Sequence, residues 1–461
     1  MRRLAAALVA FAAIATACTG GAPRAIIQTT IPTTTVAVDG TTAGSTPAGE
    51  EPAATPTTAG GIPNELDDAA GGVEYGEAAR DRLLITTRDR SILLIDPDGS
   101  NELLLHASEE GLAAYPIWAP NGERVAWSAV SPEAEGEISF SMISANIDGS
   151  NRATLATPFA SYYAAYDSSS TVLAVLGNDS TNRGTELAVG LADRDASAAR
   201  QDGDTPSYYF TWDTTGPGII AHARDGVRLL TPGEAPQPLD VGRGFYQPPL
   251  VTGAPGEIVF GQGGDALGAI QVGNFLSGGV RTLATHQGSA WMLMNPEGTQ
   301  LAVKTTGRIT APDPNTDPPV PEDVPFLELG VDIIDIETGA VTRVDDDVPI
   351  AFFWSPDGQK LLIADFQPLD GISFFQWKLY ESGSLRDIGE PFTPSPDFGG
   401  RYLPFFDQYA ISADIWSPDS TRFVYPGHNA DGGDGLWVHD LISDSATMIY
   451  EGGTFAVWSP T

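Results

Sequence analysis

Short apolar runs recur along the chain from about residue 80 to its end, and most are followed by a polar turn rich in Pro, Asp, Asn or Gly. The stretch FFWSPDGQKLLIADF, residues 352–366, shows the arrangement, with a Trp, a Ser-Pro-Asp-Gly turn and a second apolar run. Residues 117–128 (IWAPNGERVAWS) and 415–426 (IWSPDSTRFVYP) repeat it. Proline presets the φ angle of a turn and glycine accepts a positive φ, so each stretch predicts two antiparallel strands joined by a tight turn.

The position of Trp354 recurs with a mean spacing of about 49 residues, which is typical of a β-propeller with four short strands per blade. The equivalent positions, which we call the marker positions, are Trp118, Tyr166, Trp212, Val251, Met294, Trp354, Trp416 and Trp458. We therefore predict an all-β fold, a β-propeller of eight four-stranded blades. Seven blades is the alternative, if the weak repeat near Val251 is an insertion.

The Trp-Ser-Pro-Asp-Gly series, clearest at residues 118, 354, 416 and 458, resembles the repeats of TolB-type propellers, which also occur in non-catalytic domains of prolyl-oligopeptidase-like enzymes. The resemblance covers residues 80–461 and implies that each motif joins the inner strand of a blade to its second strand. The segments RLLITTR, SILLIDPDG and NELLLH would then be the outer three strands of the first blade. The C-terminal segment GTFAVWSPT would supply its inner strand, which closes the ring and removes an exposed sheet edge.

The N-terminus predicts export and a lipid anchor. Residues 1–17 combine two arginines, an apolar run and small residues, as a signal peptide does, and Cys18 follows where a lipoprotein is cleaved and acylated. Residues 18–78 are rich in Thr, Pro and Ala and predict a disordered tether, because they cannot bury enough apolar surface to fold. The propeller then occupies residues 79–461. The resemblance and these features together predict a bacterial lipoprotein held at the cell membrane or outer membrane.

Charge and motifs narrow the function classes. The formal charge of −36 disfavours nucleic acid and favours a basic partner. The sequence contains no G-x-S-x-G elbow, no H-E-x-x-H motif and no phosphate-binding loop, so no catalytic residue and no metal site is predicted. Asp96 and Asp98 could begin a calcium loop, but their DPDGSN segment is better interpreted as a hairpin turn. We therefore expect no cofactor, with calcium as the open alternative.

The candidate binding residues lie on one predicted rim, which carries the acidic segments 131–137, 312–323, 345–347 and 429–435. The long loop 391–409 falls on the same rim, and long loops are common places for function in a repeat fold. The binding residues predicted from these segments are Asp345, Asp346, Asp347, Arg401, Tyr402, Phe405, Phe406 and Tyr409. The alternative for the aromatic residues is that they pack the loop onto its own blades.

Two function classes follow. The first is a monomeric, non-enzymatic platform that binds an envelope protein or a polysaccharide. The second is a carbohydrate-binding or carbohydrate-active protein with its site in the central channel. Aromatic residues three positions before the markers would ring that channel, either stacking on a sugar or packing between blades; they are Tyr115, Tyr163, Tyr209, Trp291 and Phe455. The fold alone cannot choose between these classes.

Overall fold

A computed structural model describes residues 81–133, 137–178, 184–203, 205–214, 216, 218–239, 247–264, 267–307, 321–369, 372–429 and 432–460. The predicted signal peptide, Cys18 and the tether lie outside the described residues, as does most of the acidic insertion 312–323. No helix in the described part of the chain is long and apolar enough to cross a membrane.

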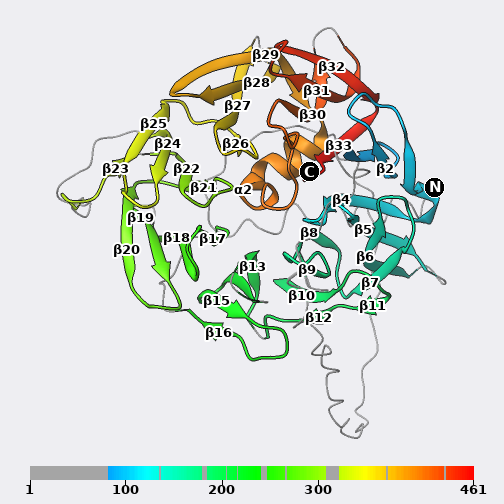
Figure 1. Cartoon of the computed structure of the whole chain (residues 1–461), viewed down its shortest axis with the longest axis horizontal. Coiled ribbons are helices and arrows are strands. Elements are labelled where there is room, and N and C mark those ends of the chain that lie inside the picture. Colours follow the sequence, from blue (N-terminus) through cyan, green and yellow to red (C-terminus); the bar gives the residue numbers. More distant parts are fainter. Residues whose placement is uncertain are drawn as a thin grey trace, which may run out of the picture.

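The described residues form sheets of short antiparallel strands, arranged as a ring around a central axis (Figure 1). In most sheets the strands follow one another in sequence order from the centre outward. The apolar runs identified in the sequence are the buried strands; for example, all five residues of β1 (Leu83–Thr87) are buried. This arrangement confirms the predicted all-β propeller.

The first sheet joins the two ends of the described chain. It has the order β3-β2-β1-β33, with β2 (Ile92–Ile95), β3 (Leu103–His106) and β33 (Gly453–Trp458). Leu83 pairs with Trp458 and Ile85 with Ala456. The C-terminal strand is therefore the inner strand of the first blade, as predicted.

The next two sheets follow the same plan, with β4 and β8 as their inner strands. The second has β4 (Leu112–Trp118), β5 (Arg124–Pro132), β6 (Ile138–Asn146), β7 (Ala153–Thr157) and the added edge strand β11 (Ala196–Ser197). The third has β8 (Ser161–Tyr166), β9 (Val172–Asn178), β10 (Thr185–Leu191) and β12 (Ala199–Arg200). A short 3-10 helix, η3 (Ser108–Glu110), precedes β4.

Three further sheets have β13, β17 and β21 as their inner strands. The fourth sheet has β13 (Ser207–Trp212), β14 (Ile219–Ala223), β15 (Gly226–Leu230) and β16 (Gln237–Pro238). The fifth has β17 (Leu250–Val251), β18 (Glu257–Gly264), β19 (Leu267–Asn274), β20 (Val280–His286) and β23 (Phe326–Leu327). The sixth has β21 (Ala290–Met294), β22 (Gln300–Thr305), β24 (Gly330–Asp335) and β25 (Val341–Asp345).

The last sheet is continuous over seven strands because β29 pairs with β30. Its strands are β26 (Ala351–Trp354), β27 (Lys360–Leu369), β28 (Ile372–Glu381), β29 (Ser384–Pro394), β30 (Arg422–Asn429), β31 (Asp434–Asp440) and β32 (Ser445–Glu451). The repeat at Trp416 contributes a single bridge to Phe423 in place of a full inner strand. Division of this sheet between β29 and β30 would give eight repeats, and the number of blades stays a prediction.

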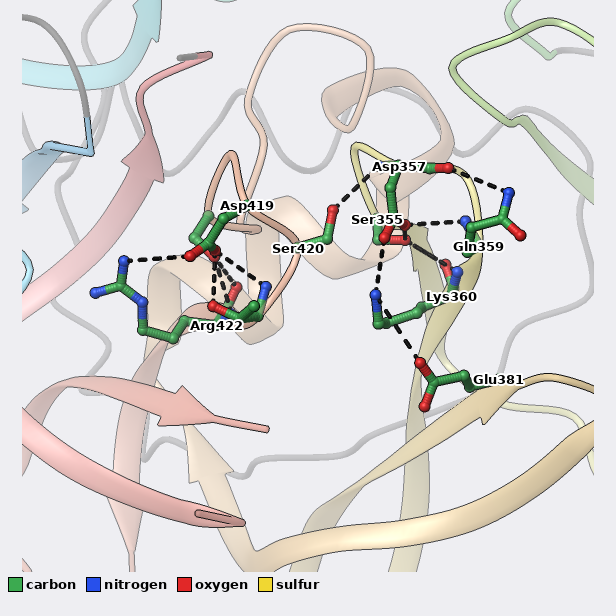
Figure 2. Close-up of polar contacts among 10 residues, drawn as sticks. Ser355, Asp357, Gln359, Lys360, Glu381, Asp419, Ser420 and Arg422 are labelled. Atoms are coloured by element: carbon green, nitrogen blue, oxygen red, sulfur yellow. Dashed lines mark hydrogen bonds and ion pairs between the residues drawn. The ribbon is translucent and has the colours of Figure 1, made fainter. Parts of the chain in front are cut away.

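The Ser-Pro-Asp turns link neighbouring repeats as well as their own strands. Ser355 Oγ donates to Asp357 Oδ1 at 2.5 Å, and the Asp357 N–H donates to Ser420 Oγ in the next repeat at 3.0 Å (Figure 2). Ser420 has φ +57°, at the turn position that Gly358 occupies with φ +65°. This left-handed conformation is unfavourable for serine, and the hydrogen bond to the neighbouring turn offsets part of its cost.

The marker tryptophans also join neighbouring repeats. Trp354 is buried, and its indole N–H donates to the Leu293 carbonyl at 3.1 Å, directly before the marker Met294 of the preceding repeat. Trp416 donates in the same way to the Phe353 carbonyl at 3.3 Å. These contacts place the marker tryptophans between neighbouring sheets, where each binds the preceding repeat.

The DPDGSN segment forms the hairpin turn between β2 and β3. The Asp96 N–H donates to the Ser100 carbonyl and the Gly99 N–H to the Asp96 carbonyl, both at 2.9 Å. The Asp96 carboxylate pairs with Arg82 at 3.0 Å, while Asp98 accepts a hydrogen bond from the Ser100 N–H. The turn interpretation of this segment is confirmed.

Candidate binding site at the plugged channel

Residues 395–414, which we call the plug, lie at the centre of the ring (Figure 1). The plug contains a π-helical turn, η5 (Phe398–Tyr402), a 3-10 turn, η6 (Leu403–Phe405), and the helical turn α2 (Phe406–Tyr409). It begins where β29 ends, and Ser395 Oγ both accepts from the Phe398 N–H at 3.2 Å and donates to the Thr454 carbonyl at 2.6 Å. The segment is thus attached at its start to the first residues of β33.

The plug satisfies backbone groups on inner strands that face the channel. Gln408 binds both main-chain groups of Phe210 in β13, donating to its carbonyl at 3.0 Å and accepting from its N–H at 3.1 Å. The Tyr409 hydroxyl donates to the Tyr162 carbonyl in β8 at 2.6 Å. An inner strand has no sheet neighbour on its channel side, so these side chains act in place of a further strand.

Aromatic contacts attach the plug to other inner strands. The ring centroid of Phe406 lies 4.7 Å from that of Phe352 in β26, and Tyr402 lies 5.2 Å from Phe455 in β33. Tyr115 in β4 stacks on Tyr409 at 5.8 Å with an interplanar angle of 8°. These bonds and ring contacts join the plug to inner strands from five of the seven sheets formed by the described residues, and α2 also lies beside β21, the inner strand of a sixth.

Most aromatic side chains of the plug are buried. Tyr402, Phe406 and Tyr409 are buried, while Phe405 and Arg401 are partly exposed. The three buried rings do not form an exposed surface on the rim, and their role in binding stays a prediction. The aromatic side chains pack against the protein, which was the alternative prediction. They contact more blades than the two that flank the loop, because the plug crosses the channel.

Three of the five predicted channel aromatics contact the plug, whereas the ring centroid of Tyr209 lies 6.5 Å from that of His222 in β14. Tyr115 and Tyr163 meet Tyr409, and Phe455 meets Tyr402. The ammonium group of Lys304 lies 4.3 Å from the ring centroid of Trp291. The faces that were expected either to stack on a sugar or to pack between blades thus contact protein groups at the channel.

Lys304 and Asp407 are buried at the channel, while Asp414, at the end of the plug, is half-buried. Lys304 Nζ donates to the Ile350 carbonyl at 2.7 Å, and burial lowers the pKa of Lys304 to about 8, opposed by the nearby Asp407 carboxylate. Burial raises the pKa of Asp407 to about 7, opposed by Lys304. Burial also raises the pKa of Asp414 to about 7, against hydrogen bonds from the Trp416 and Ile415 N–H groups.

The Asp345–Asp347 segment divides into one structural residue and two surface residues. Asp345 is buried and accepts from Lys378 Nζ at 3.1 Å, and Asp365 contacts the same ammonium group at 2.9 Å. Burial by itself lowers the pKa of Lys378, but the bonds to Asp365 and Asp345 outweigh it and raise this pKa above its usual range. Asp346 and Asp347 have side chains that are 95% and 74% exposed. Asp345 therefore joins neighbouring sheets, which corrects its assignment to the binding surface.

A small cleft opens at the edge of the plug, with an interior of about 20 Å³, which is room for about one water molecule. Its polar lining consists of Thr86, Arg90, Asp397 and Arg401, and its aromatic lining of Tyr115, Tyr402, Tyr409 and Phe455. Arg90 makes a two-pronged ion pair with Asp397, with N–O distances of 2.7 and 3.1 Å. Arg401 Nη1 lies 3.3 Å from the same carboxylate. Among the predicted residues, the structure brings Arg401, Tyr402 and Tyr409 together here.

The sequence interpretation missed Arg90, Asp397 and Thr86. Arg90 lies in the turn between β1 and β2, far in sequence from Asp397. No spacing rule relates residues so distant, and only the resemblance, which places both loops on one rim, could have suggested their proximity. In the described part of the chain, no group of three or more His, Cys, Asp or Glu residues is arranged to hold a metal ion.

Comparison with known proteins gives similarity at the level of fold. No protein-family model and no curated protein matches this sequence. Among solved structures, dihydro-heme d1 dehydrogenase NirN in complex with DHE is similar over 83% of this chain and 76% of its own, with 12% identity and a TM-score of 0.55. The likeness is one of fold.

Two further structures are more distant. TolB from Acinetobacter baumannii matches over 82% of this chain and 66% of its own, with 10% identity and a TM-score of 0.36. A puromycin-hydrolyzing peptidase from Mycobacterium tuberculosis matches over 75% of this chain and 54% of its own, with 12% identity and a TM-score of 0.45. A TolB structure is thus among the matches, while the lipoprotein assignment stays a prediction.

Proposed function

We propose that this protein is a non-enzymatic binding platform, exported and held at the bacterial envelope by a lipid on Cys18. Its ligand-binding surface is the plug face, defined as the exposed plug residues with the loops around them, including Asp346, Asp347 and the cleft. The ligand is an envelope protein or a polysaccharide, and a basic protein fits the charge best.

The observation that carries this proposal is the plug. A channel site would need the aromatic residues of the inner strands to face a substrate, but Tyr115, Tyr163 and Phe455 contact the plug. The plug is itself fixed by hydrogen bonds to inner strands of different sheets. Binding at the rim is therefore favoured over chemistry in the channel. In the carbohydrate-active alternative these aromatic rings would stack on a sugar, but here they contact the plug.

The charge distribution supports a basic partner. The exposed carboxylates of Asp346 and Asp347 belong to a chain whose formal charge is −36. Charges on a rim mainly accelerate encounter with an oppositely charged partner, and salt weakens their effect. Nucleic acid is disfavoured because its phosphates would be repelled.

Site-specific photo-crosslinking in the native envelope tests this proposal. A photoreactive residue replaces Asp346, in the connection from β25 to β26, or, in the matched control, the exposed Gln359, in the turn from β26 to β27 at the other end of β26. We expect a discrete crosslinked partner from position 346 and none from position 359. Equal crosslinking at the two positions, or none at either, would contradict a binding role for the plug face.

A further inference from the structure

Arg343 in β25 lies between a buried carboxylate and an exposed one. Its Nε is 3.1 Å from Asp332 Oδ1, across the pairing of β24 with β25, and 3.9 Å from Asp346 Oδ1. The Asp332 side chain is 3% exposed, whereas that of Asp346 is 95% exposed. One guanidinium group therefore links the interior of the sixth sheet to the plug face, of which Asp346 is a part.

The backbone around this guanidinium group is shaped to hold it. Arg343 Nη1 donates to the Leu329 carbonyl at 2.9 Å. Gly330 has φ +134°, and a β-carbon at this position would collide with Arg343 Nη1 and with the Asp345 carbonyl. Glycine adopts this conformation and leaves the space that the guanidinium group occupies. Arg343 is therefore fixed between the two carboxylates.

Only one oxygen of the buried carboxylate is paired. Asp332 Oδ2 is buried and has no hydrogen-bond partner among the described residues, although Oδ1 pairs with Arg343. Buried polar atoms are nearly always paired, so this carboxylate is less well satisfied than is usual for a charged group inside a protein. Burial disfavours the charged form of a carboxyl group. It raises the pKa of Asp332 to about 6, and the neighbouring Arg343 opposes this rise.

Other charged groups surround Asp332 in its own sheet, in β20 of the neighbouring sheet and in the loops between them. These charged and titratable groups are Lys304, Arg343, Asp345, Asp346, Glu328, Arg281 and His286. Arg343 favours the ionised form of Asp332, whereas Asp346 and Glu328 disfavour it. Lys304 and Arg281 donate to main-chain carbonyls, and Asp345 pairs with Lys378. Burial lowers the pKa of His286.

We propose that Asp332 and Arg343 form a proton-sensitive pair that sets the negative charge of the plug face. When Asp332 is ionised, it neutralises Arg343 and leaves the exposed carboxylate of Asp346 to attract a basic partner. When Asp332 takes up a proton from water, the charge of Arg343 is no longer compensated from inside and acts on Asp346, 3.9 Å away. The plug face then attracts a basic partner less strongly in acid. This inference rests on the proposed function and adds regulation by pH to the same surface.

A direct test follows the Arg343 side chain by NMR in the purified full chain, with ¹⁵N in the arginine residues. The Arg343 Nε resonance should shift with a midpoint near pH 6, where Asp332 takes up its proton. In Asp332→Asn it should stay constant between pH 5 and 7, because no proton is gained. The measurement on the parent needs no substitution near the pair, and a constant Arg343 resonance there would overturn the proposal.

Binding of a nonalysine peptide tests the consequence for the plug face, since lysine side chains do not titrate in this range. Between pH 7 and pH 5 at low salt, the parent should lose about threefold more affinity than Asp332→Asn, and the pH dependence common to both chains cancels. Asp335→Asn is the matched control. Hydrogen bonds from Thr338 hold the pKa of Asp335, in the same strand, below its usual range, so this variant should behave as the parent. Equal losses in the parent and Asp332→Asn would contradict the proposal.

The outcomes separate this inference from the proposed function. A partner crosslinked from position 346, together with a constant Arg343 resonance, would leave the platform and remove its regulation by pH. A shifting Arg343 resonance without any crosslinked partner would support the proton-sensitive pair and contradict the platform.

Discussion

The indole N–H of Trp354 donates a 3.1 Å hydrogen bond to the main-chain carbonyl of Leu293, in the preceding repeat. The same relation joins Trp416 to Phe353, Trp212 to Ala165 and Trp118 to Val457. In each pair the acceptor directly precedes a marker residue. The motif tryptophan therefore stabilises the ring by packing and also by a directional bond between repeats.

Trp354→Phe keeps an aromatic ring but removes this bond. We expect the free energy of unfolding to fall by about 1–3 kcal/mol beyond the loss of ring volume, because the buried Leu293 carbonyl loses its donor. Trp377→Phe is the control, since Trp377 is 1% exposed and its indole nitrogen has no hydrogen-bond partner among the described residues. Chemical denaturation measures both; equal losses would show that the indole bond contributes nothing.

Deleting residues 453–461 removes β33 from the first sheet. The deletion takes away the partner of β1, the acceptor of the Trp118 indole and the ring of Phe455 against Tyr402. We expect loss of the cooperative thermal transition for the whole propeller, because two sheet edges become exposed. A truncated chain that melts at the parent temperature would contradict the role of β33 in closure.

Lys378→Met tests the buried ion cluster. The variant leaves Asp345 and Asp365 facing each other without a cation, so we expect a loss of about 3–5 kcal/mol in the free energy of unfolding. Asp346→Asn, at the fully exposed neighbour, should change it by less than about 0.5 kcal/mol. Denaturation at neutral pH measures both variants, and similar small effects would show that Asp345 is not structural.

Asp414→Asn should change how stability depends on pH. The pKa of Asp414 is raised from 3.8 to about 7 in the folded chain, so the folded state binds more protons than the unfolded chain between these values. Its contribution to stability is therefore greatest below pH 3.8 and is lost as the pH rises to 7. Asn cannot lose a proton, so the stability of the variant relative to the parent should rise by up to about 1.4 kcal/mol per pH unit between pH 5 and 7.

Denaturation of the parent and of Asp414→Asn at several pH values provides this comparison. Gln359→Ala serves as the control, because this exposed side chain carries no titratable group and its difference from the parent should stay nearly constant. A constant difference for Asp414→Asn as well would show that Asp414 is not held protonated by burial.

Cys18→Ala tests the lipid anchor. The variant should move from the membrane fraction to the soluble exported fraction, because a lone cysteine after a signal peptide is the only acylation position predicted here. Circular dichroism should show the same fold as the parent, since the propeller residues are unchanged. Continued membrane association of the variant would contradict lipid attachment at Cys18. The binding role of the plug face would still be tested separately by crosslinking from position 346.

Local rules were sufficient for much of the fold. The Pro and Gly turns, the spacing of the marker residues and the alternation of apolar runs depend on backbone preferences within one repeat. The pairing of β33 with β1 followed from the position of the last motif and the need to cover a sheet edge. These features are periodic, so a single sequence contains several independent copies of the same signal.

The candidate site depended on contacts that no local rule contains. Residues 395–414 interrupt the repeat, and their aromatic side chains could have faced a partner or the protein with equal propensity. The tertiary structure determined that these side chains face the protein. Gln408 binds Phe210, 198 residues away in sequence, and Tyr409 binds Tyr162, 247 residues away. Burial of these rings depends on which surfaces come together at the channel, and the same holds for Asp345 beside Lys378 and for Arg90 beside Asp397. Sequence alone determined the repeating scaffold, whereas only the assembled ring determined which of its polar and aromatic groups remain accessible.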